Sequence, residues 1–385
     1  MGPLHGFKIV EIAGIGPGQL CGMLLADMGA QLIRIDRPVT GDLGMPMPAK
    51  YDIMNRNRPT LAVDLKSKEG VELVLRLCED ADALFEGFRP GVMERAGLGP
   101  ADCMARNERL VYGRMTGWGQ HGPLADSVGH DTNYIALAGA LGAMGDKDRP
   151  PPVPLNLVGD FGGGALYLAV GMLAAMLETS KSGKGQVVDA AMVDGVASMM
   201  TMFYGLIAGG MWNDSRQSNL FDGAAPFAKN YETKDGKYVS VCAIENRFFR
   251  AFLESMQISE IDAKDQHKVG QWTEQEAIIA ARFRERTRDE WSDILEGTDS
   301  CAAPVLSITE APQHIHSEAR KTYVTVDGIK QPGPAPRFSR TPSEIKHGPT
   351  VPGERDREAL SEWGLSNAEI DRLLKEGILR SKTAA

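Results

Sequence analysis

The chain has 385 residues, of which 43% are hydrophobic and 24% are charged, and its formal net charge is −9. This length exceeds one typical domain, so we expect two domains with ample apolar material for their cores. The acidic balance argues against a protein that binds nucleic acid through a basic surface. A local basic cluster still suits one small phosphorylated ligand.

The five cysteines are far apart in the sequence, odd in number, and form no CxxC pair. They are Cys21, Cys78, Cys103, Cys242 and Cys301. This pattern predicts free thiols in a reducing compartment, and neither a disulfide framework nor a zinc site. The first residues show no secretory signal, and the C-terminus is not the Ser-Lys-Leu peroxisomal address. We therefore expect a cytoplasmic protein.

Hydrophobic periodicity alternates between strand and helix through the first 115 residues. The predicted strands cover 7–13, 31–36, 59–65, 81–87 and 109–115, and the predicted helices cover 16–30 and 68–80, the second capped by Ser67. Such alternation predicts βαβ units, hence an α/β fold with an open parallel Rossmann-like sheet and helices on both faces. In such sheets a ligand binds beyond the carboxyl ends of the strands.

The loops after these strands are rich in glycine, proline and basic residues. The basic residues are Arg37, Arg56, Arg58, Lys66, Arg89 and Arg95. Any one of them suits a solvated surface position, whereas several on one rim would bind the phosphates of a nucleotide-like ligand. The sequence GIGPG (14–18) superficially resembles a dinucleotide fingerprint, but its GxGxG spacing displaces the third glycine. A tight βα turn that favours an anion at a helix N-terminus explains it equally well.

Residues 195–212 contain no charged side chain and just reach the length of a minimal membrane span. The segment is rich in methionine rather than leucine, contains four glycines, and has no flanking basic loops. We interpret it as a buried helix or a subunit contact, and we expect no membrane association.

The pattern changes after about residue 225, where we expect a smaller α+β domain. Residues 228–244 fit a β-hairpin around a KDG turn, 281–297 have charged helical spacing, and 330–344 form a Pro-rich strap. The sequence SNAE (366–369) is a capping box that opens a last short helix. The predicted domains are a large α/β domain (1–195), a connecting helix and linker (196–224), a small α+β domain (225–318), and a return strap with a C-terminal helix (319–385).

His130 and Asp160 each stand before a long apolar segment. Taken singly, His130 suits a core position, and Asp131 and Asp160 suit helix N-caps. Together, the histidine and Asp160 form an acid/base couple, because a helix N-terminus keeps an aspartate ionised and a histidine exchanges a proton near pH 7. Two such bases suit the inversion of a carbon stereocentre through an enolate. The backbone N–H groups of glycines 162–164 would then stabilise the enolate oxygen.

Five motifs carry a family resemblance: TGWGQHGP (116–123), GHDTNY (129–134), NLVGDFGGG (156–164), GKGQVVDAAMVDG (183–195) and PAPRFSR (334–340). Together they resemble the class III CoA-transferase superfamily, and more narrowly its α-methylacyl-CoA racemase branch. The resemblance runs from about residue 4 to about residue 340. It implies an interlocked homodimer, with the site between the large domain of one subunit and the small domain of the other.

The resemblance also implies roles for individual residues. Asp160 and His130 would stand on either side of the substrate α-carbon, and Glu245 would hydrogen-bond His130. The bound nucleotide would be the coenzyme A of the substrate thioester rather than NAD. Its contacts would be Arg37, Val63, Asp64, Leu65, Lys66, Gly87, Phe88, Arg89, Arg95, Gly129, Asp131 and Tyr134. Ile15 and Met192 would line the acyl pocket, since methionines suit sliding apolar chains.

The sequence therefore predicts an enzyme that interconverts (2R)- and (2S)-2-methylacyl-CoA thioesters by 1,1-proton transfer, with no metal and no prosthetic group. One alternative is a CoA transferase in which Asp160 is a nucleophile that forms an acyl anhydride. A second alternative is a non-catalytic protein that binds acyl-CoA. An NAD-dependent dehydrogenase is the most distant alternative.

Overall fold

The computed structural model describes residues 2–38, 47–351 and 353–379, and the chain forms two compact units. The first unit comprises Met1–Ala138, Pro154–Met200 and Lys321–Ala385, and the second comprises Gly139–Val153 and Thr201–Arg320.

A six-stranded parallel sheet forms the centre of the first unit. Its strands are, in spatial order, β3 (Thr60–Ala62), β2 (Gln31–Asp36), β1 (Lys8–Ile12), β4 (Ala83–Glu86), β5 (Val111–Thr116) and β6 (Val187–Ala191). This is the strand order of a doubly wound Rossmann-type sheet, in which the order reverses between β1 and β4. The predicted α/β fold class is confirmed.

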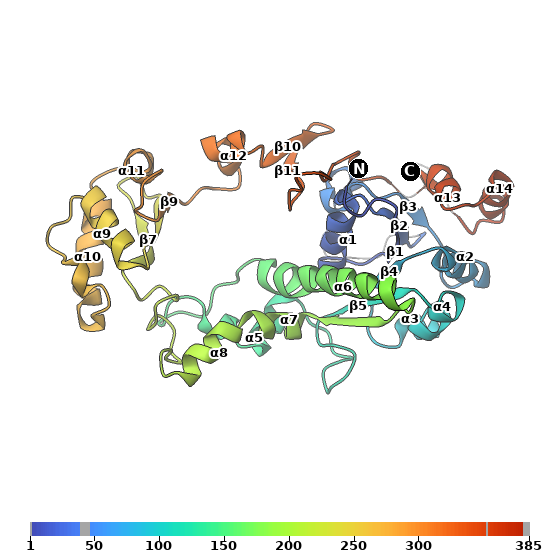
Figure 1. The fold of residues 1–385 in the computed structure, drawn as a ribbon, viewed down its shortest axis with the longest axis horizontal. Coiled ribbons are helices and arrows are strands. Elements are labelled where there is room, and N and C mark those ends of the chain that lie inside the picture. The colour runs from blue at the N-terminus through green and yellow to red at the C-terminus, as the bar shows by residue number, and fades with distance from the viewer. Residues whose placement is uncertain (1, 39–46, 352, 380–385) are drawn as a thin grey trace. The chain divides into compact units, whose positions relative to one another are not determined.

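Helices cover both faces of this sheet (Figure 1). One face carries α2 (Lys68–Glu79), α4 (Pro100–Arg106), α13 (Asp356–Glu362) and α14 (Asn367–Lys375), with α3 (Val92–Arg95) before α4. The other face carries α1 (Pro17–Asp27) and α6 (Tyr167–Ser182), and nearby lie α5 (Asp131–Leu137) and α7 (Met192–Met199). Buried aliphatic side chains such as Val74 on one face and Leu168 on the other fill the two cores. Because both faces are covered, the strands are near-continuous apolar runs, as the sequence indicated.

The two helix starts that were predicted from capping residues, at Ser67 and Ser366, are confirmed. The Ser67 hydroxyl accepts the Gly70 N–H at the start of α2, and Ser366 and Glu369 form the capping box of α14. Strand β6 was not predicted from the sequence. It is an edge strand without an apolar run, and its residues Val187 and Asp189 are exposed.

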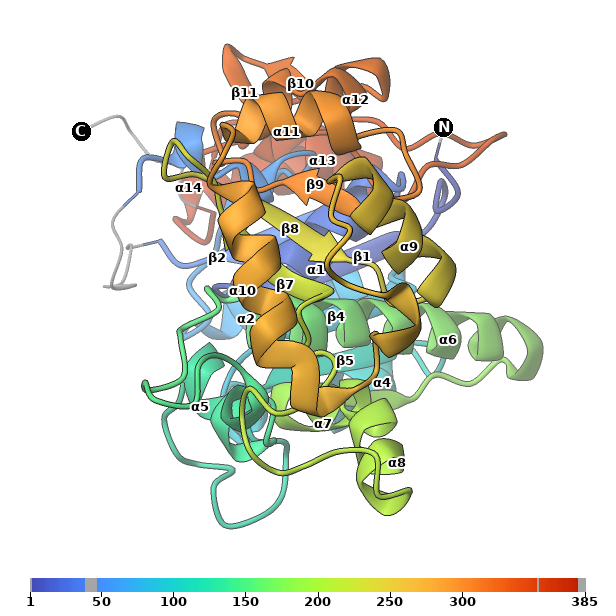
Figure 2. The ribbon, with the colours of Figure 1, turned by 90° about the vertical axis from the view of Figure 1, so that its left-hand side faces the viewer.

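The second unit contains an antiparallel sheet of β7 (Ala228–Glu232), β8 (Tyr238–Cys242) and β9 (Ala302–Pro304). Helices α9 (Asn246–Ser255) and α10 (Trp272–Phe283) lie on the same side of β7 and β8 (Figures 1 and 2), and α11 (Arg288–Leu295) completes an aromatic core with them. The unit also contains α8 (Thr201–Ala208) and α12 (Ile315–Ala319).

The prediction of helical structure throughout 281–297 is wrong, because this range contains parts of two helices. Helix α10 ends at Phe283, and α11 begins only at Arg288. Thr287 causes the break, because its hydroxyl accepts the Glu290 N–H in a capping box that starts a new helix.

The Pro-rich strap begins inside a hairpin. Strands β10 (Tyr323–Val326) and β11 (Ile329–Pro332) pair around Asp327 and Gly328, both with positive φ. An Asp-Gly pair in this conformation is a favoured two-residue hairpin turn.

The apolar stretch 195–212 is not one continuous helix, since α7 ends at Met199 and α8 begins at Thr201. Within the described residues, Leu157–Ser182 is long and apolar enough to cross a bilayer by length and composition alone. One side of it, with Leu168, Met172 and Met176, is buried in the core beside the sheet, whereas Val170 and Leu177 are exposed.

Candidate active site

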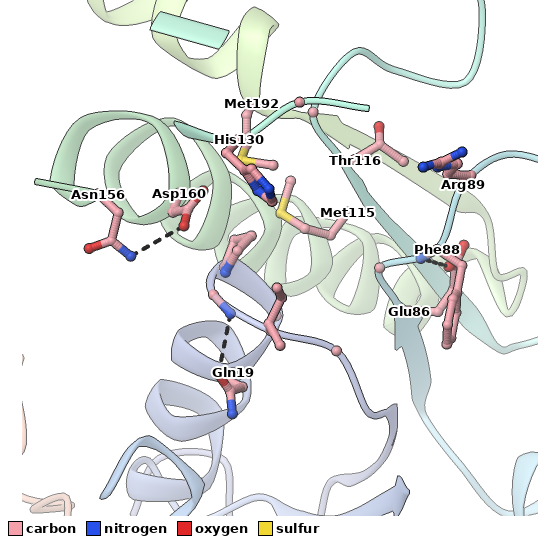
Figure 3. A pocket seen from close by; sticks show the side chains of 18 of the residues that line it. Gln19, Glu86, Phe88, Arg89, Met115, Thr116, His130, Asn156, Asp160 and Met192 are labelled. Atoms are coloured by element: carbon pink, nitrogen blue, oxygen red, sulfur yellow. Dashed lines mark hydrogen bonds between the residues drawn. The ribbon is translucent and has the colours of Figure 1, made fainter. Parts of the chain in front are cut away.

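A cavity of about 1140 Å³ opens at the carboxyl ends of β1, β4 and β5 (Figure 3). Its walls include Gly14–Gln19 after β1, Phe85–Pro90 around the end of β4, Met115–Trp118 at the end of β5, Ser127–His130 before α5, and Asn156, Asp160 and Met192. This is the position at which Rossmann-type sheets bind ligands, beside the reversal of strand order. His130 and Asp160, far apart in the sequence, thus border one space.

His130 is the N-cap residue of α5, with an extended backbone at φ −133°. Its N–H donates to Asn133 Oδ1 at 3.0 Å, which fixes the start of the helix. The imidazole is exposed and lies at the cavity wall near Met192, as Figure 3 shows. An exposed histidine at a helix start is a group that can exchange protons with a bound ligand.

Asp160 lies in the first turn of η4 (Leu157–Leu166), a π-helical segment that runs directly into α6. Asn156 Nδ2 donates to Asp160 Oδ2 at 3.2 Å. Burial raises the pKa of Asp160, Asp131 raises it further, and Asn156 and His130 lower it. Since the net direction is upward, Asp160 holds a proton at higher pH than an exposed aspartate does.

The carboxylate of Asp131 ties α5 to η4. Its Oδ2 accepts the N–H groups of Gly159 and Asp160, each at 2.7 Å, and the residue is only 6% exposed. A Cβ at Gly159 would lie 2.6 Å from this oxygen, so glycine is required there. The backbone that carries Asp160 is therefore fixed by the neighbour of His130.

Gly16, at the start of α1, stands beside the Asp160 carboxylate. Its φ is 65°, and a Cβ on it would lie 2.9 Å from Asp160 Oδ2. Gln19 Oε1 accepts the Gly16 N–H at 3.2 Å and holds the turn. A helix N-terminus favours an anion, and here the Asp160 carboxylate is one such anion. This weakens the interpretation of GIGPG as a dinucleotide-binding motif.

Glycines 162–164 have a packing role in η4. They are not among the described residues that line the cavity, and all three pack against α7. A Cβ on Gly163 would lie 2.6 Å from Val196 Cγ2, and one on Gly164 would lie 2.9 Å from Met192 Cγ. These glycines allow η4 and α7 to approach closely. The oxyanion role of their backbone N–H groups stays a prediction.

The expected coenzyme A contacts are divided by the structure into two groups. Gly87, Phe88, Arg89, Gly129 and Tyr134 line the cavity. Arg37, Val63, Asp64, Leu65, Lys66, Arg95 and Asp131 are not among its described lining residues. Of the second group, the Arg37 guanidinium lies 5.8 Å from the centre of the Phe88 ring, beside the first group.

Arg56 and Arg58 are not part of a basic rim, which corrects the sequence interpretation. The Arg56 guanidinium is 2% exposed and pairs with Asp27 at 2.6 Å. Arg58 is fully buried and pairs with Glu11. Because each guanidinium is bound by a buried carboxylate, neither is available to a phosphate.

Tyr134 packs edge-on against Trp118, with ring centroids 4.7 Å apart, and its hydroxyl donates to the Gly129 carbonyl oxygen. Burial raises the pKa of Tyr134 to about 12, with a further contribution from Asp160. The phenol therefore stays neutral and holds the loop before His130.

Ile15 and Met192 line the cavity, as expected for an apolar group of the ligand. Sequence reasoning missed Met115, Asn156 and Glu86, which line it too. Burial raises the pKa of Glu86 to about 7, and its Oε2 accepts the Phe88 N–H at 2.6 Å. The position of Asn156, one helical turn before Asp160, was the available signal for its role.

Glu245 belongs to the second unit, where it is the exposed N-cap residue of α9. Its expected hydrogen bond to His130 remains a prediction.

The fold and the cavity define an α/β protein with a cavity at the switch point of a doubly wound sheet, and a histidine and an aspartate line that cavity. The chain belongs to CoA-transferase family III, whose family profile matches residues 4–355. It is 40% identical to mouse and 37% identical to human α-methylacyl-CoA racemase, and each alignment covers 98% of both chains. The crystal structure of a CAIB/BAIF family protein from Brucella suis shares the fold, with a TM-score of 0.79 and 24% identity over 94% of this chain and 99% of that chain.

Proposed function

We propose that this chain is an α-methylacyl-CoA racemase, which interconverts (2R)- and (2S)-2-methylacyl-CoA thioesters through an enolate. The observation that carries the proposal is that His130 and Asp160 line one cavity. The full-length similarity to the mouse and human proteins of that name supports it.

The chemistry needs one group to remove the α-proton and another to deliver a proton to the opposite face. For one epimer His130 is the base and protonated Asp160 is the acid, and for the other epimer the roles reverse. The raised pKa of Asp160 suits this exchange, because it brings the carboxyl group closer to the pKa range of an imidazole.

The thioester would enter with its nucleotide along the loops after β4 and before α5. We propose that it contacts five residues that line the cavity: Gly87, Phe88, Arg89, Gly129 and Tyr134. The remaining proposed contacts are Arg37, Val63, Asp64, Leu65, Lys66, Arg95 and Asp131. The acyl chain would lie against Ile15 and Met192, and we propose that no prosthetic group or metal takes part.

The proposal includes a homodimer in which Glu245 of the second unit supports His130. The exposed apolar surface of α8 supports an assembly, because Met202, Tyr204 and Ile207 are 47% exposed or more and α8 has no buried residue. Large exposed apolar patches mark interaction sites. The five free thiols accord with the cytoplasmic location that we also propose.

Epimer analysis of a (2R)-2-methylacyl-CoA incubated with the pure protein tests the function. We expect conversion towards an even mixture without any acyl acceptor, and loss of conversion in Asp160→Asn. If the protein instead moves coenzyme A to an added carboxylate, and hydroxylamine traps an acyl group on Asp160, the chain is a transferase. Binding without either reaction would indicate a non-catalytic acyl-CoA binding protein.

A further inference from the structure

Two cysteines face each other across β8 and β9 in the second unit. The antiparallel register pairs Val241 with Ala302, and the Cys242 N–H donates to the Cys301 carbonyl oxygen at 2.9 Å. Cys242 ends β8 and Cys301 directly precedes β9, so the two residues lie opposite each other just beyond the paired residues of the ladder. Both residues are exposed, whereas the other three cysteines are buried.

The separation of such a pair suits a disulfide. In an antiparallel ladder, a hydrogen-bonded pair has its Cα atoms about 5.5 Å apart. Disulfides join residues whose Cα atoms are about 4.4–6.8 Å apart, most often about 5.5–6 Å. The Cα atoms therefore suit a disulfide, whereas the Cβ atoms of a hydrogen-bonded pair, about 5.5 Å apart, must approach each other by about 1 Å before the two sulfurs bond.

The backbone of Cys301 leaves the strand conformation beside this partner. Its φ is 49°, in the left-handed region that residues other than glycine rarely adopt. In that conformation the Cβ crowds the residue's own carbonyl side. That carbonyl oxygen accepts the Cys242 N–H. Backbone outliers of this kind are often associated with functional sites.

The surroundings of Cys301 favour its neutral thiol, because they raise its pKa. Burial raises the pKa of the Cys301 thiol, and Glu245, Cys242 and Asp299 raise it further, whereas Arg247 lowers it. The thiolate is the reactive form, so exchange should accelerate as the pH rises above neutrality.

We propose that Cys242 and Cys301 form a thiol–disulfide exchange site that reacts with a low-molecular-weight disulfide such as glutathione disulfide. One thiolate attacks a sulfur of glutathione disulfide, forms a mixed disulfide and releases one glutathione thiolate. The second thiol loses its proton and attacks the protein sulfur of the mixed disulfide, which releases the second glutathione. The two cysteines are oxidised to one disulfide, and glutathione disulfide is reduced to two glutathiones.

Closure of this bond affects Glu245, which follows Cys242 by three residues and begins α9. This consequence rests on the proposed function, in which Glu245 supports His130. Because small displacements of positioning groups reduce catalysis strongly, we expect the racemisation rate of the oxidised protein to fall by about tenfold or more.

Peptide mapping of the full-length protein after incubation with glutathione disulfide at pH 8 tests the exchange directly. We expect a linked peptide containing Cys242 and Cys301, lighter by two hydrogen atoms, that dithiothreitol cleaves. Peptides with Cys21, Cys78 and Cys103 provide an internal control and stay unmodified, because these thiols are buried. In Cys301→Ser the glutathione should remain attached to Cys242, since the resolving thiol is absent.

The site is refuted if both cysteines of the wild type remain free, or if each retains its own glutathione. A linkage between two chains instead of within one refutes it as well. Peptide mapping does not depend on catalysis. A linked peptide in a protein without racemase activity in either redox state would therefore contradict the proposed function and leave the exchange site standing.

Discussion

The carboxyl group of Asp160 lies between neighbours that act on its pKa in opposite directions. Burial and the charge of Asp131 raise the pKa, and the hydrogen bond from Asn156 lowers it. As a base, Asp160 works in its ionised form, so activity in that direction is lost as the pH falls through its pKa. Burial and these two neighbours therefore act together on the acid limb of the pH profile.

Replacing Asn156 by alanine removes the hydrogen bond that favours the carboxylate. We expect the Asp160 pKa to rise and the acid limb of kcat/KM to move to higher pH by on the order of one unit. The effect should appear for the epimer whose α-proton Asp160 removes, and the pH dependence of both epimers measures it.

Asp131→Asn is the matched opposite change. Its amide oxygen still accepts the N–H groups of Gly159 and Asp160, but the negative charge is gone. The acid limb should then move to lower pH for the same epimer. If the Asn156 and Asp131 variants shift the limb in the same direction, our account of the Asp160 pKa is wrong.

Several individual residues were predictable from the sequence, and others were not. His130 and Asp160 carry chemical types and neighbours that single them out, and both line the cavity. Arg56 and Arg58 were misplaced because their partners are remote: Glu11 precedes Arg58 by 47 residues. A charge pattern along the chain does not reveal such pairing, which depends on how β1 and its neighbours pack.

At the scale of elements, the contact between η4 and α7 positions Asp160. It depends on glycine, since a Cβ on Gly163 would meet both the side chain and the backbone nitrogen of Val196, at 2.6 and 2.9 Å. We expect Gly163→Ala to lower the free energy of unfolding by about 1–3 kcal/mol, the cost of overpacking a well-packed core.

Gly205→Ala is the control for that substitution. Gly205 lies inside α8, and nothing stands within 4 Å of an added Cβ. Alanine there should stabilise the protein by roughly 0.5–1 kcal/mol, because glycine is a poor helix former. Urea denaturation of both variants measures the difference, and equal effects would contradict a packing role for Gly163.

Elements with strong local signals were predictable, and those that depend on tertiary context were not. Ser67 and Ser366 mark helix starts by their own hydrogen bonds, so both starts were correct. Strand β6 has an exposed, partly polar sequence and exists because it pairs with β5. The break at Thr287 was missed because helical spacing continues across it, while the capping box interrupts the backbone.

At the scale of the whole molecule, the exposed apolar surface of α8 leads to an assembly prediction. We expect the wild type to have twice the chain mass of 41.7 kDa in sedimentation equilibrium. Ile207→Lys should weaken the dimer, since it places a charge in an apolar contact. Val269→Lys, at an exposed apolar position of the second unit outside α8, is the control and should leave the dimer intact. A monomeric wild type would contradict the homodimer.

The fold class followed from the alternation of strands and helices, but the course of the chain between the two units did not. Residues 139–153 belong to the second unit although residues 154–200 return to the first. The first crossing, near residue 139, lies inside an apolar, glycine-rich run, whereas the charged and proline-rich run DKDRPPP (146–152) precedes the second and was an available signal.

The most direct test of the account is α-deuterium incorporation from D2O into each epimer of a 2-methylacyl-CoA, for the wild type and for His130→Ala and Asp160→Asn. We predict that the wild type exchanges the α-proton of both epimers while it interconverts them. Each variant should lose racemisation, because one of the two bases is missing. Full racemisation with deuterium incorporation in His130→Ala would show that His130 is not a base of this site.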